Sequence, residues 1–188
     1  HALAEGGLPV CEVLLHRDDD SLNRIKSIAK NAPEVIVGAG SVISLRDAEE
    51  AMEAGAKFFV APGLVPEGVE FAMKKKMPIL PGCVTASDIS IALNYGINIL
   101  KFFPIYQLGG AETLAQYHGG PFGKVEWVVT GGLNGKNFLP FAGIDYVLAS
   151  GGDWMFAENN AVNDKNYEQI VNNTRKTIND VLEVRRKK

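Results

Sequence analysis

The chain has 188 residues, enough for one domain, and its composition of 46% hydrophobic and 22% charged residues excludes a disordered protein. Its net charge of −3 argues against nucleic-acid binding, which usually accompanies a basic excess. No apolar run reaches the ~20 residues of a membrane span, and the distant Cys11 and Cys83 predict free thiols in the cytoplasm, not a disulfide scaffold or zinc site.

Seven short apolar runs, six of which end in Gly or Pro, alternate with stretches of helical periodicity. The predicted strands are 10–15, 35–40, 57–63, 77–82, 99–104, 125–132 and 146–152. The predicted helices are 21–32, 47–56, 67–76, 87–96, 111–117 and 163–184, and the opening HALAEGG has the pattern of a helix end.

Strict alternation of strand and helix predicts parallel strands with right-handed crossovers. No unit opens with a GxGxxG turn, and small residues follow nearly every strand, which favours a (β/α)8 TIM barrel over an open doubly wound sheet. Seven units are one short of eight. We therefore expect residues 1–188 to form a single barrel domain from which the first strand and most of the first helix are missing.

Lys101 lies in the apolar run Ile-Leu-Lys-Phe-Phe-Pro, on the same predicted face as Ile99 and Phe103. Lysine is almost never buried without a reason, and a neutral amine in apolar surroundings is a nucleophile toward carbonyls. The run therefore predicts Schiff-base chemistry at Lys101. The alternative is a lysine that reaches water or pairs with a carboxylate.

Glu12 shares a predicted strand face with Val10, Leu14 and His16, and we expect Glu12 to lie deepest and His16 nearest the carboxyl end. A carboxylate inside a barrel needs a partner, for which Lys101 is the natural candidate. Glu12 could then act as a general acid–base. The alternative is a purely structural ion pair.

Glycine pairs follow the last two strands, in Thr130-Gly131-Gly132 and in the Gly151-Gly152 that precedes Asp153. TIM barrels commonly bind phosphate in the loops after strands 7 and 8, where backbone N–H groups can approach an anion. The alternative is that these glycine pairs only form tight connections between strand and helix and bind no ligand. Asp153 argues against phosphate, because a carboxylate repels a dianion.

Ser41 ends the small-residue turn after 35–40, where it could offer a hydroxyl to a carboxylate or only complete a turn. The aspartates at 18–20 are interpreted as acids at a helix N-terminus and not as a metal site. His118 is predicted to lie in a surface loop.

The motifs EVxL, VGAGSV, APGL, PILPG, LKFFP, TGGL and ASGGDW occur in this order, and their combination resembles the KDPG/KHG aldolase family. These are 2-keto-3-deoxy-6-phosphogluconate and 4-hydroxy-2-oxoglutarate aldolases. The resemblance runs through nearly the whole chain. It implies a class I aldolase of carbohydrate metabolism, a lyase on a (β/α)8 barrel that is usually a homotrimer. It also implies a small 2-keto acid substrate, no metal and no other cofactor, with neither a nucleic acid nor a membrane as partner.

By position, the resemblance implies that Lys101 is the Schiff-base lysine and Glu12 the general acid–base. It implies substrate-binding roles for Ser41, Pro62, Thr130, Gly131, Gly132 and Gly152. Two positions depart from the family: its carboxylate-binding arginine is His16 here, and its phosphate-binding serine is Asp153. The two residues of the imine chemistry, Lys101 and Glu12, thus match the family, while the residues at the carboxylate-binding and phosphate-binding positions differ from it.

The resulting prediction is reversible cleavage of a 2-keto-4-hydroxy acid to pyruvate and an aldehyde, with the aldehyde and its phosphorylation left open. The changed residues His16 and Asp153 leave a second interpretation open, a degenerate aldolase-like protein that binds a small acid. A third is another phosphate-binding TIM-barrel enzyme, an isomerase or a transferase similar to thiamin-phosphate synthase. The buried lysine of the KFFP run favours the aldolase.

Overall fold

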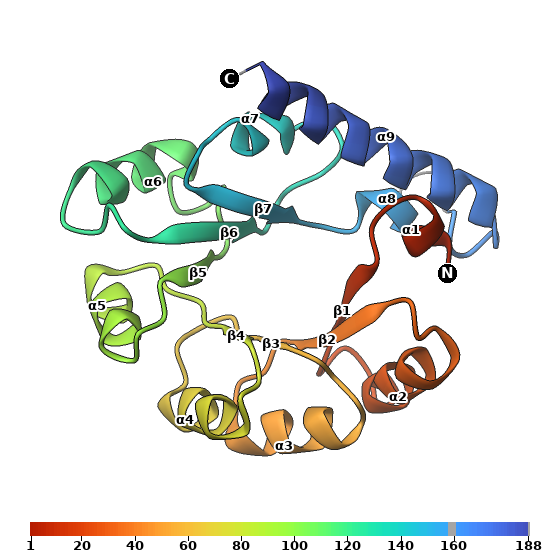
Figure 1. Cartoon of the computed structure of the whole chain (residues 1–188), viewed down its shortest axis with the longest axis horizontal. Coiled ribbons are helices and arrows are strands. Elements are labelled where there is room, and N and C mark those ends of the chain that lie inside the picture. Colours follow the sequence, from red (N-terminus) through yellow and green to blue (C-terminus); the bar gives the residue numbers. More distant parts are fainter. Residues whose placement is uncertain (158–160, 188) are drawn as a thin grey trace. The chain divides into compact units, whose positions relative to one another are not determined.

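A computed structural model describes residues 1–157 and 161–187, and strands alternate with helices along them (Figure 1). The chain forms two compact units. The first consists of His1 and Pro9–Tyr95, and the second of Ala2–Leu8 and Gly96–Lys188. Within each unit every pair of neighbouring strands is parallel.

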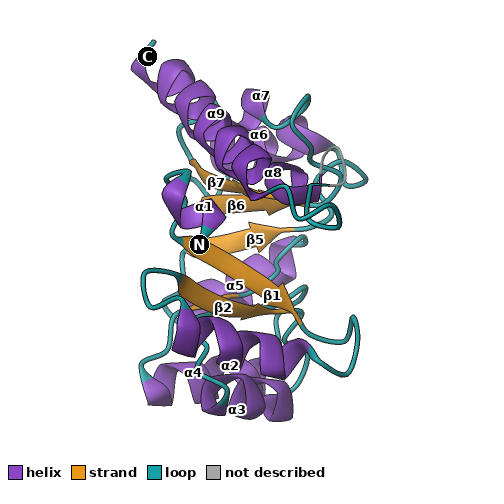
Figure 2. Cartoon of the chain, turned by 90° about the vertical axis from the view of Figure 1, so that its right-hand side faces the viewer, coloured by secondary structure: helices purple, strands orange, loops and turns teal. Residues whose placement is uncertain are grey.

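The first unit contains a four-stranded sheet in the order β1-β2-β3-β4. Its strands are β1 (Val10–Leu14), β2 (Ile36–Gly40), β3 (Phe59–Val60) and β4 (Ile79–Leu80). They are followed in turn by the helices α2 (Ser21–Asn31), α3 (Leu45–Glu53), α4 (Pro66–Lys75) and α5 (Ala86–Asn94). Helices α2, α3 and α4 cover one face of this sheet (Figure 1, Figure 2). The fully buried Ile25, Ala39 and Phe59 belong to the core beneath them.

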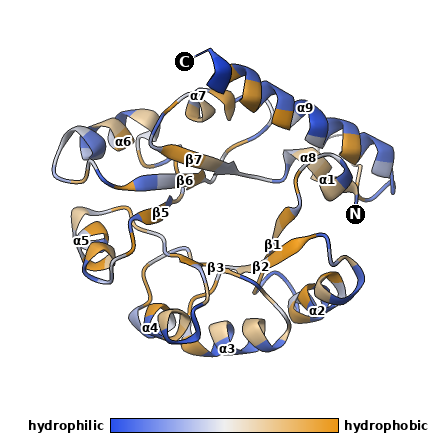
Figure 3. Ribbon diagram, in the orientation of Figure 1, coloured by the Kyte–Doolittle hydropathy of each residue, from blue (hydrophilic) through white to orange (hydrophobic). Residues whose placement is uncertain are grey.

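The second unit contains a three-stranded sheet in the order β5-β6-β7. Its strands are β5 (Ile99–Phe102), β6 (Glu126–Thr130) and β7 (Val147–Gly151). Its helices are α1 (Ala2–Glu5), α6 (Gly110–Gly119), α7 (Leu139–Ala142), α8 (Trp154–Ala157) and α9 (Tyr167–Arg186). Helices α1 and α8 both pack against α9. Hydrophobic and hydrophilic residues alternate along α9, as in a helix with one apolar face (Figure 3).

Three aromatic rings anchor β5 and β6 to the helix side of the second unit. Phe102 and Trp127 are fully buried and meet edge to face, with ring centroids 5.5 Å apart. Tyr117 of α6 stacks on Trp127 at 6.2 Å. Since successive side chains of a strand point to opposite faces, this packing directs Leu100 and Phe102 to one side and Lys101 to the other.

Helix α9 joins distant parts of the second unit. Gly6, directly after α1, lies so close to it that an added Cβ would be 2.5 Å from the Cβ of Thr174. Near the other end of α9, the Arg185 guanidinium donates hydrogen bonds to the carbonyls of Val147 (3.0 Å) and Leu148 (2.9 Å) in β7. The same helix therefore fixes α1 and one strand of the sheet.

All seven predicted strands are confirmed, as is the α/β class with parallel strands. Closure into a barrel, the single domain and an additional first strand stay predictions. Helices α7 and α8 were not predicted, because four residues are too few to show a period. The loop position of His118 is wrong: it lies in α6, with its ring stacked on Tyr146 at 3.9 Å.

Cys11 and Cys83 are free thiols, as predicted. Burial raises the pKa of the Cys83 thiol to about 12. Among the helices of the described residues, none has the length and apolar character to cross a membrane.

Candidate active site

The carboxylate of Glu12 lies over the backbone at the carboxyl end of β2. Glu12 pairs with Gly38 in register, and its side chain extends toward Gly40. A Cβ on Gly40 would be 2.6 Å from Glu12 Cδ, closer than real contacts, so only glycine leaves room for the carboxylate there. Glu12 is exposed while Leu14 is half-buried. The expectation that Glu12 lies deepest is therefore wrong.

Ser41 directly follows Gly40 and adopts a left-handed backbone conformation, with φ of +59°. This conformation is unfavourable for a residue with a Cβ, so the fold must hold the turn in place. The hydrogen bond from Val42 N–H to the Val60 carbonyl, 3.1 Å, ties the turn to β3. The half-buried Ser41 is thereby kept beside the position that the Glu12 carboxylate covers.

His16 lies next to the same turn, but strand alternation does not place it there. Strand β1 ends at Leu14, Leu15 N–H donates to the Gly40 carbonyl at 2.9 Å, and His16 has φ of +61°. The prediction that His16 continues the Glu12 face of the strand is therefore wrong. Its position near the carboxyl end of β1 is confirmed. The ring Nε2 lies 3.2 Å from Oδ2 of Asp47.

Asp47, in the first turn of α3, was missed by the sequence analysis. Its N–H donates to the Ser44 hydroxyl (3.1 Å), which caps the helix, and its Oδ2 accepts the Ile43 N–H (2.9 Å). Partial burial raises the pKa of this carboxyl, but the hydrogen bonds from Ile43, Ser44 and His16 together lower it below its ordinary value. The Ser-x-x-Asp pattern is a capping signal that could have located Asp47. Its contact with His16 has no sequence signal.

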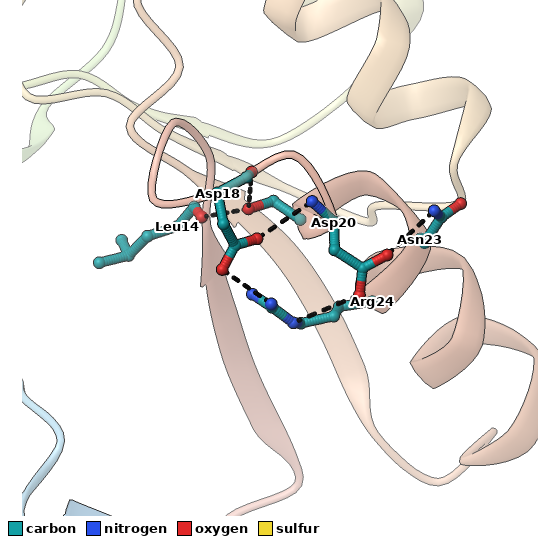
Figure 4. Close-up of polar contacts among 6 residues, drawn as sticks. Leu14, Asp18, Asp20, Asn23 and Arg24 are labelled. Atoms are coloured by element: carbon teal, nitrogen blue, oxygen red, sulfur yellow. Dashed lines mark hydrogen bonds and ion pairs between the residues drawn. The ribbon is translucent and has the colours of Figure 1, made fainter.

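The loop from β1 to α2 is held by its own polar groups (Figure 4). Asp18 accepts the Asp20 N–H at 3.1 Å and pairs with Arg24 at 2.8 Å, while the Ser21 hydroxyl donates to the Leu14 carbonyl at 3.0 Å. The hydrogen bond from Arg24 is the main reason that the pKa of Asp18 lies below its ordinary value. These acids therefore fasten the loop that carries His16, in agreement with their interpretation as residues at a helix start.

Pro62 follows β3 at the same end of the sheet and is half-buried. The next turn lies against it, because a Cβ on Gly82 would clash with the Pro62 carbonyl and lie 2.8 Å from the Gly63 nitrogen. Gly82 N–H also donates to the Gly63 carbonyl at 3.3 Å. The first unit thus brings Glu12, His16, Ser41 and Pro62 to the carboxyl ends of its strands.

In the second unit, Lys101 is 7% exposed in the middle of β5, between the fully buried Leu100 and Phe102. Its Nζ lies 5.2 Å from the centroid of the Phe103 ring, a cation–π distance. Ile99 and Phe103, which share its face as predicted, are each 39% exposed. The predicted apolar setting of this amine is confirmed.

Thr130 lies on the same side of the sheet as Lys101. Lys101 pairs with Val128 in register, and Thr130 is two residues further along β6. Its hydroxyl is buried and has no hydrogen-bond partner in the described part of the chain. An unsatisfied buried hydroxyl is unfavourable, so this group is well suited to bind a polar ligand.

The turn after Thr130 requires its two glycines. Gly131 and Gly132 have φ of +93° and +76°, and a Cβ on Gly131 would be 2.8 Å from the Cα of Pro104. The Asn137 side chain closes the turn by donating to the Gly132 carbonyl at 2.9 Å. The turn is therefore held in a shape that brings backbone groups near the carboxyl end of β6.

Gly152 and Asp153 follow β7 and are both exposed. The ring of Trp154 occupies the space that a Cβ on Gly152 would need. The Asp153 carbonyl accepts the N–H groups of Phe156 (3.0 Å) and Ala157 (2.8 Å), so this residue opens α8. The substrate-binding role that the resemblance implies for Asp153 stays a prediction.

A family model described as KDPG and KHG aldolase matches residues 1–173. This chain belongs to that family. It is 36% identical over 177 residues to the KHG/KDPG aldolase of Escherichia coli (strain K12). The aligned region covers 94% of this chain and 82% of the relative. The predictions of the KDPG/KHG aldolase family and of a carbon–carbon lyase are confirmed.

Two solved structures of aldolases are also similar to the chain. One is KDPG aldolase from Legionella pneumophila with pyruvate captured as a covalent carbinolamine intermediate: 30% identity, TM-score 0.86, covering 93% of this chain and 83% of that one. The other is the 2-keto-3-deoxy-6-phosphogluconate aldolase of Zymomonas mobilis with 3-phosphoglycerate: 33% identity, TM-score 0.84, covering 93% and 80%. The roles assigned above to single residues of this aldolase-family chain stay predictions.

Proposed function

We propose that this member of the KDPG/KHG aldolase family cleaves a 2-keto-4-hydroxy acid reversibly to pyruvate and an aldehyde, through a Schiff base on Lys101. The observation that carries the proposal is the burial of Lys101, which is 7% exposed in an apolar strand. It shares a sheet face with the Thr130 hydroxyl, which has no hydrogen-bond partner among the described residues. A desolvated amine is a better nucleophile, since burial disfavours its charged form. The carbinolamine of the Legionella relative supports the same chemistry here.

The proposed reaction begins when Lys101 Nζ attacks the C2 ketone and the carbinolamine loses water to give a protonated imine. Glu12 then takes the proton of the C4 hydroxyl. The C3–C4 bond breaks, its electron pair moves to the imine as an enamine, and the aldehyde leaves. Protonation of C3 and hydrolysis of the imine release pyruvate and restore the Lys101 amine. In this proposal Ser41, Thr130 and His16 bind the substrate carboxylate, and Pro62 lines the pyruvate end.

For this chemistry we propose that the strands of both units belong to one (β/α)8 barrel, so that Glu12 and Lys101 act on the same substrate. The parallel pairing in both sheets supports this arrangement, as does the position of His16, Ser41, Pro62 and Thr130 at carboxyl ends of strands. We further propose a homotrimer in the cytoplasm that needs no cofactor. Analytical ultracentrifugation at micromolar concentration tests the trimer, and a monomer would refute it.

The aldehyde half of the substrate is proposed to lie against the turns that contain Gly131, Gly132 and Gly152. Their backbone groups suit a polar or anionic ligand, while the Asp153 carboxylate repels a phosphate dianion and accepts hydrogen bonds from hydroxyl groups. We therefore propose that unphosphorylated 2-keto-4-hydroxy acids are preferred. Turnover of a phosphorylated and an unphosphorylated substrate of the same chain length tests this preference.

Trapping with borohydride tests the imine directly. Incubation of the whole chain with pyruvate and sodium borohydride should add a reduced pyruvyl group to Lys101, located by peptide mass spectrometry. Lys101→Met should remove the adduct, and Lys57→Met, a lysine of the first unit, should not. The proposed function is wrong if no adduct forms at saturating pyruvate.

A further inference from the structure

We infer that Asp47 is a positioning residue that holds the His16 ring where it binds the carboxylate of the keto acid. The inference rests on the proposed function, because it concerns the pyruvate half of the same substrate. Nothing in the family pattern of the sequence marks Asp47. It is singled out by the 3.2 Å contact between its Oδ2 and His16 Nε2.

The His16 ring lies beside the proposed pyruvate end. Leu15, one residue earlier, donates its N–H to the Gly40 carbonyl, and Gly40 is the residue that the Glu12 carboxylate covers. Ser41 follows immediately. All of these contacts lie within the first unit. A carboxylate bound at the Ser41 turn would therefore be within reach of an imidazole next to it.

The Asp47 carboxylate is better fixed than the ring that it holds. The side chain of Asp47 is 11% exposed and that of His16 is 49% exposed. Asp47 Oδ2 also accepts the Ile43 N–H at 2.9 Å, so one oxygen connects the loop that carries His16 to the loop that follows Ser41. An exposed ring on a left-handed residue has several orientations available, and a buried acceptor selects one of them.

The contact also determines which ring nitrogen remains for a ligand. With Nε2 directed at Asp47, Nδ1 is the nitrogen that can face a substrate. In the protonated ring both nitrogens donate, one to Asp47 and the other to the keto-acid carboxylate. The charged group in contact with the ring is Asp47 of α3, and Asp18 of the loop that carries His16 is paired with Arg24.

Asp47 has a second role as part of a helix cap, and the chain contains a matched control for it. In α5, Asp88 donates its N–H to the Thr85 hydroxyl (3.2 Å), and its Oδ2 accepts the N–H groups of Val84 (3.2 Å) and Thr85 (3.0 Å). This is the arrangement of Ser44, Ile43 and Asp47 without a histidine. The variants Asp47→Asn and Asp88→Asn therefore remove the same charge from equivalent caps, and only the first removes it from a histidine.

The experiment measures the pyruvate concentration that gives half-maximal borohydride trapping at Lys101, together with kcat and KM for cleavage. In Asp47→Asn we expect this concentration and KM to rise about tenfold, the effect of losing a charge-assisted hydrogen bond, while kcat at saturation changes less than about twofold. In Asp88→Asn the half-maximal pyruvate concentration and KM should stay at their wild-type values, although the melting temperature should fall as it does in Asp47→Asn.

A second pair of variants tests whether Asp47 acts through His16. Arginine is always charged and carries several donors, so in a His16→Arg background the further change Asp47→Asn should raise KM less than twofold. Equal KM values in Asp47→Asn and Asp88→Asn, or an undiminished effect of Asp47→Asn beside Arg at position 16, would overturn the inference while leaving the proposed function intact. Failure of the wild-type chain to form an adduct at Lys101 would overturn both.

Discussion

Gly40→Ala is expected to disable the proposed proton transfer by Glu12 without altering any ionisable group. The new Cβ would lie 2.6 Å from Cδ and 2.7 Å from Cγ of Glu12, and closer still to Oε1. To restore an ordinary contact of 3.4 Å, the carboxyl carbon has to move by about 0.8 Å. A misplacement of about 1 Å in a reacting group costs on the order of 100-fold in rate, so kcat should fall by about that factor.

The folded state should tolerate this change, because the atoms in the way are the far end of a flexible side chain and Gly40 does not need a positive φ. Cleavage is followed by coupling pyruvate release to its reduction, and stability by thermal unfolding. Gly119→Ala, where a Cβ would meet nothing within 4 Å, is the control and should keep its activity. Wild-type kcat in Gly40→Ala, with Glu12 displaced in a crystal structure, would refute the assignment of proton transfer to Glu12.

Three further predictions concern other residues. Asp153→Ser should raise kcat/KM for a phosphorylated substrate at least about tenfold relative to the unphosphorylated one, because it removes a like charge; an unchanged ratio would remove Asp153 from substrate recognition. In the native protein iodoacetamide should label Cys11 well before Cys83, whose thiol pKa burial raises to about 12, and equal rates by peptide mass spectrometry would contradict this. Burial raises the pKa of the Asp88 carboxyl, but the hydrogen bonds that it accepts from Thr85 and Val84 hold this pKa below the ordinary value. The charged carboxylate therefore stabilises the folded state above ~pH 4. This stabilisation is lost as pH falls through the lowered pKa of the folded state. Urea unfolding of Asp88→Asn should therefore show a deficit of ~0.5 kcal/mol at pH 7 that shrinks as pH falls below ~4.

The sequence alone was sufficient to predict the seven strands and the apolar surroundings of Lys101. Runs such as 99–104 and 125–132 are rich in β-branched and aromatic residues and end in Gly or Pro, signals that depend only on local sequence. Alternation also assigns Leu100 and Phe102 to the face of the aromatic core and Lys101 to the opposite face of β5.

The site around Glu12 could be predicted only in part. Alternation assigned His16 to the face of Glu12, but β1 ends at Leu14 and a left-handed residue breaks the period. The exposure of Glu12 depends on Gly38 and Gly40 of the neighbouring strand, and the Asp47 contact joins residues 31 positions apart. Such pairings depend on the register between strands and on turn geometry, which one sequence does not contain.

The packing of α1 on α9 has a consequence for synthesis on the ribosome. Residues Pro9–Tyr95 of the first unit emerge together, and their contacts with one another span short stretches of chain. Helix α1 emerges before all of them, yet Gly6 packs against Thr174, so its partner helix α9 is translated only after the strands of both units. The nascent chain must therefore keep α1 undocked for most of translation, at elongation rates of ~5–20 residues per second. Docking of α1 then follows the synthesis of every strand of the two sheets.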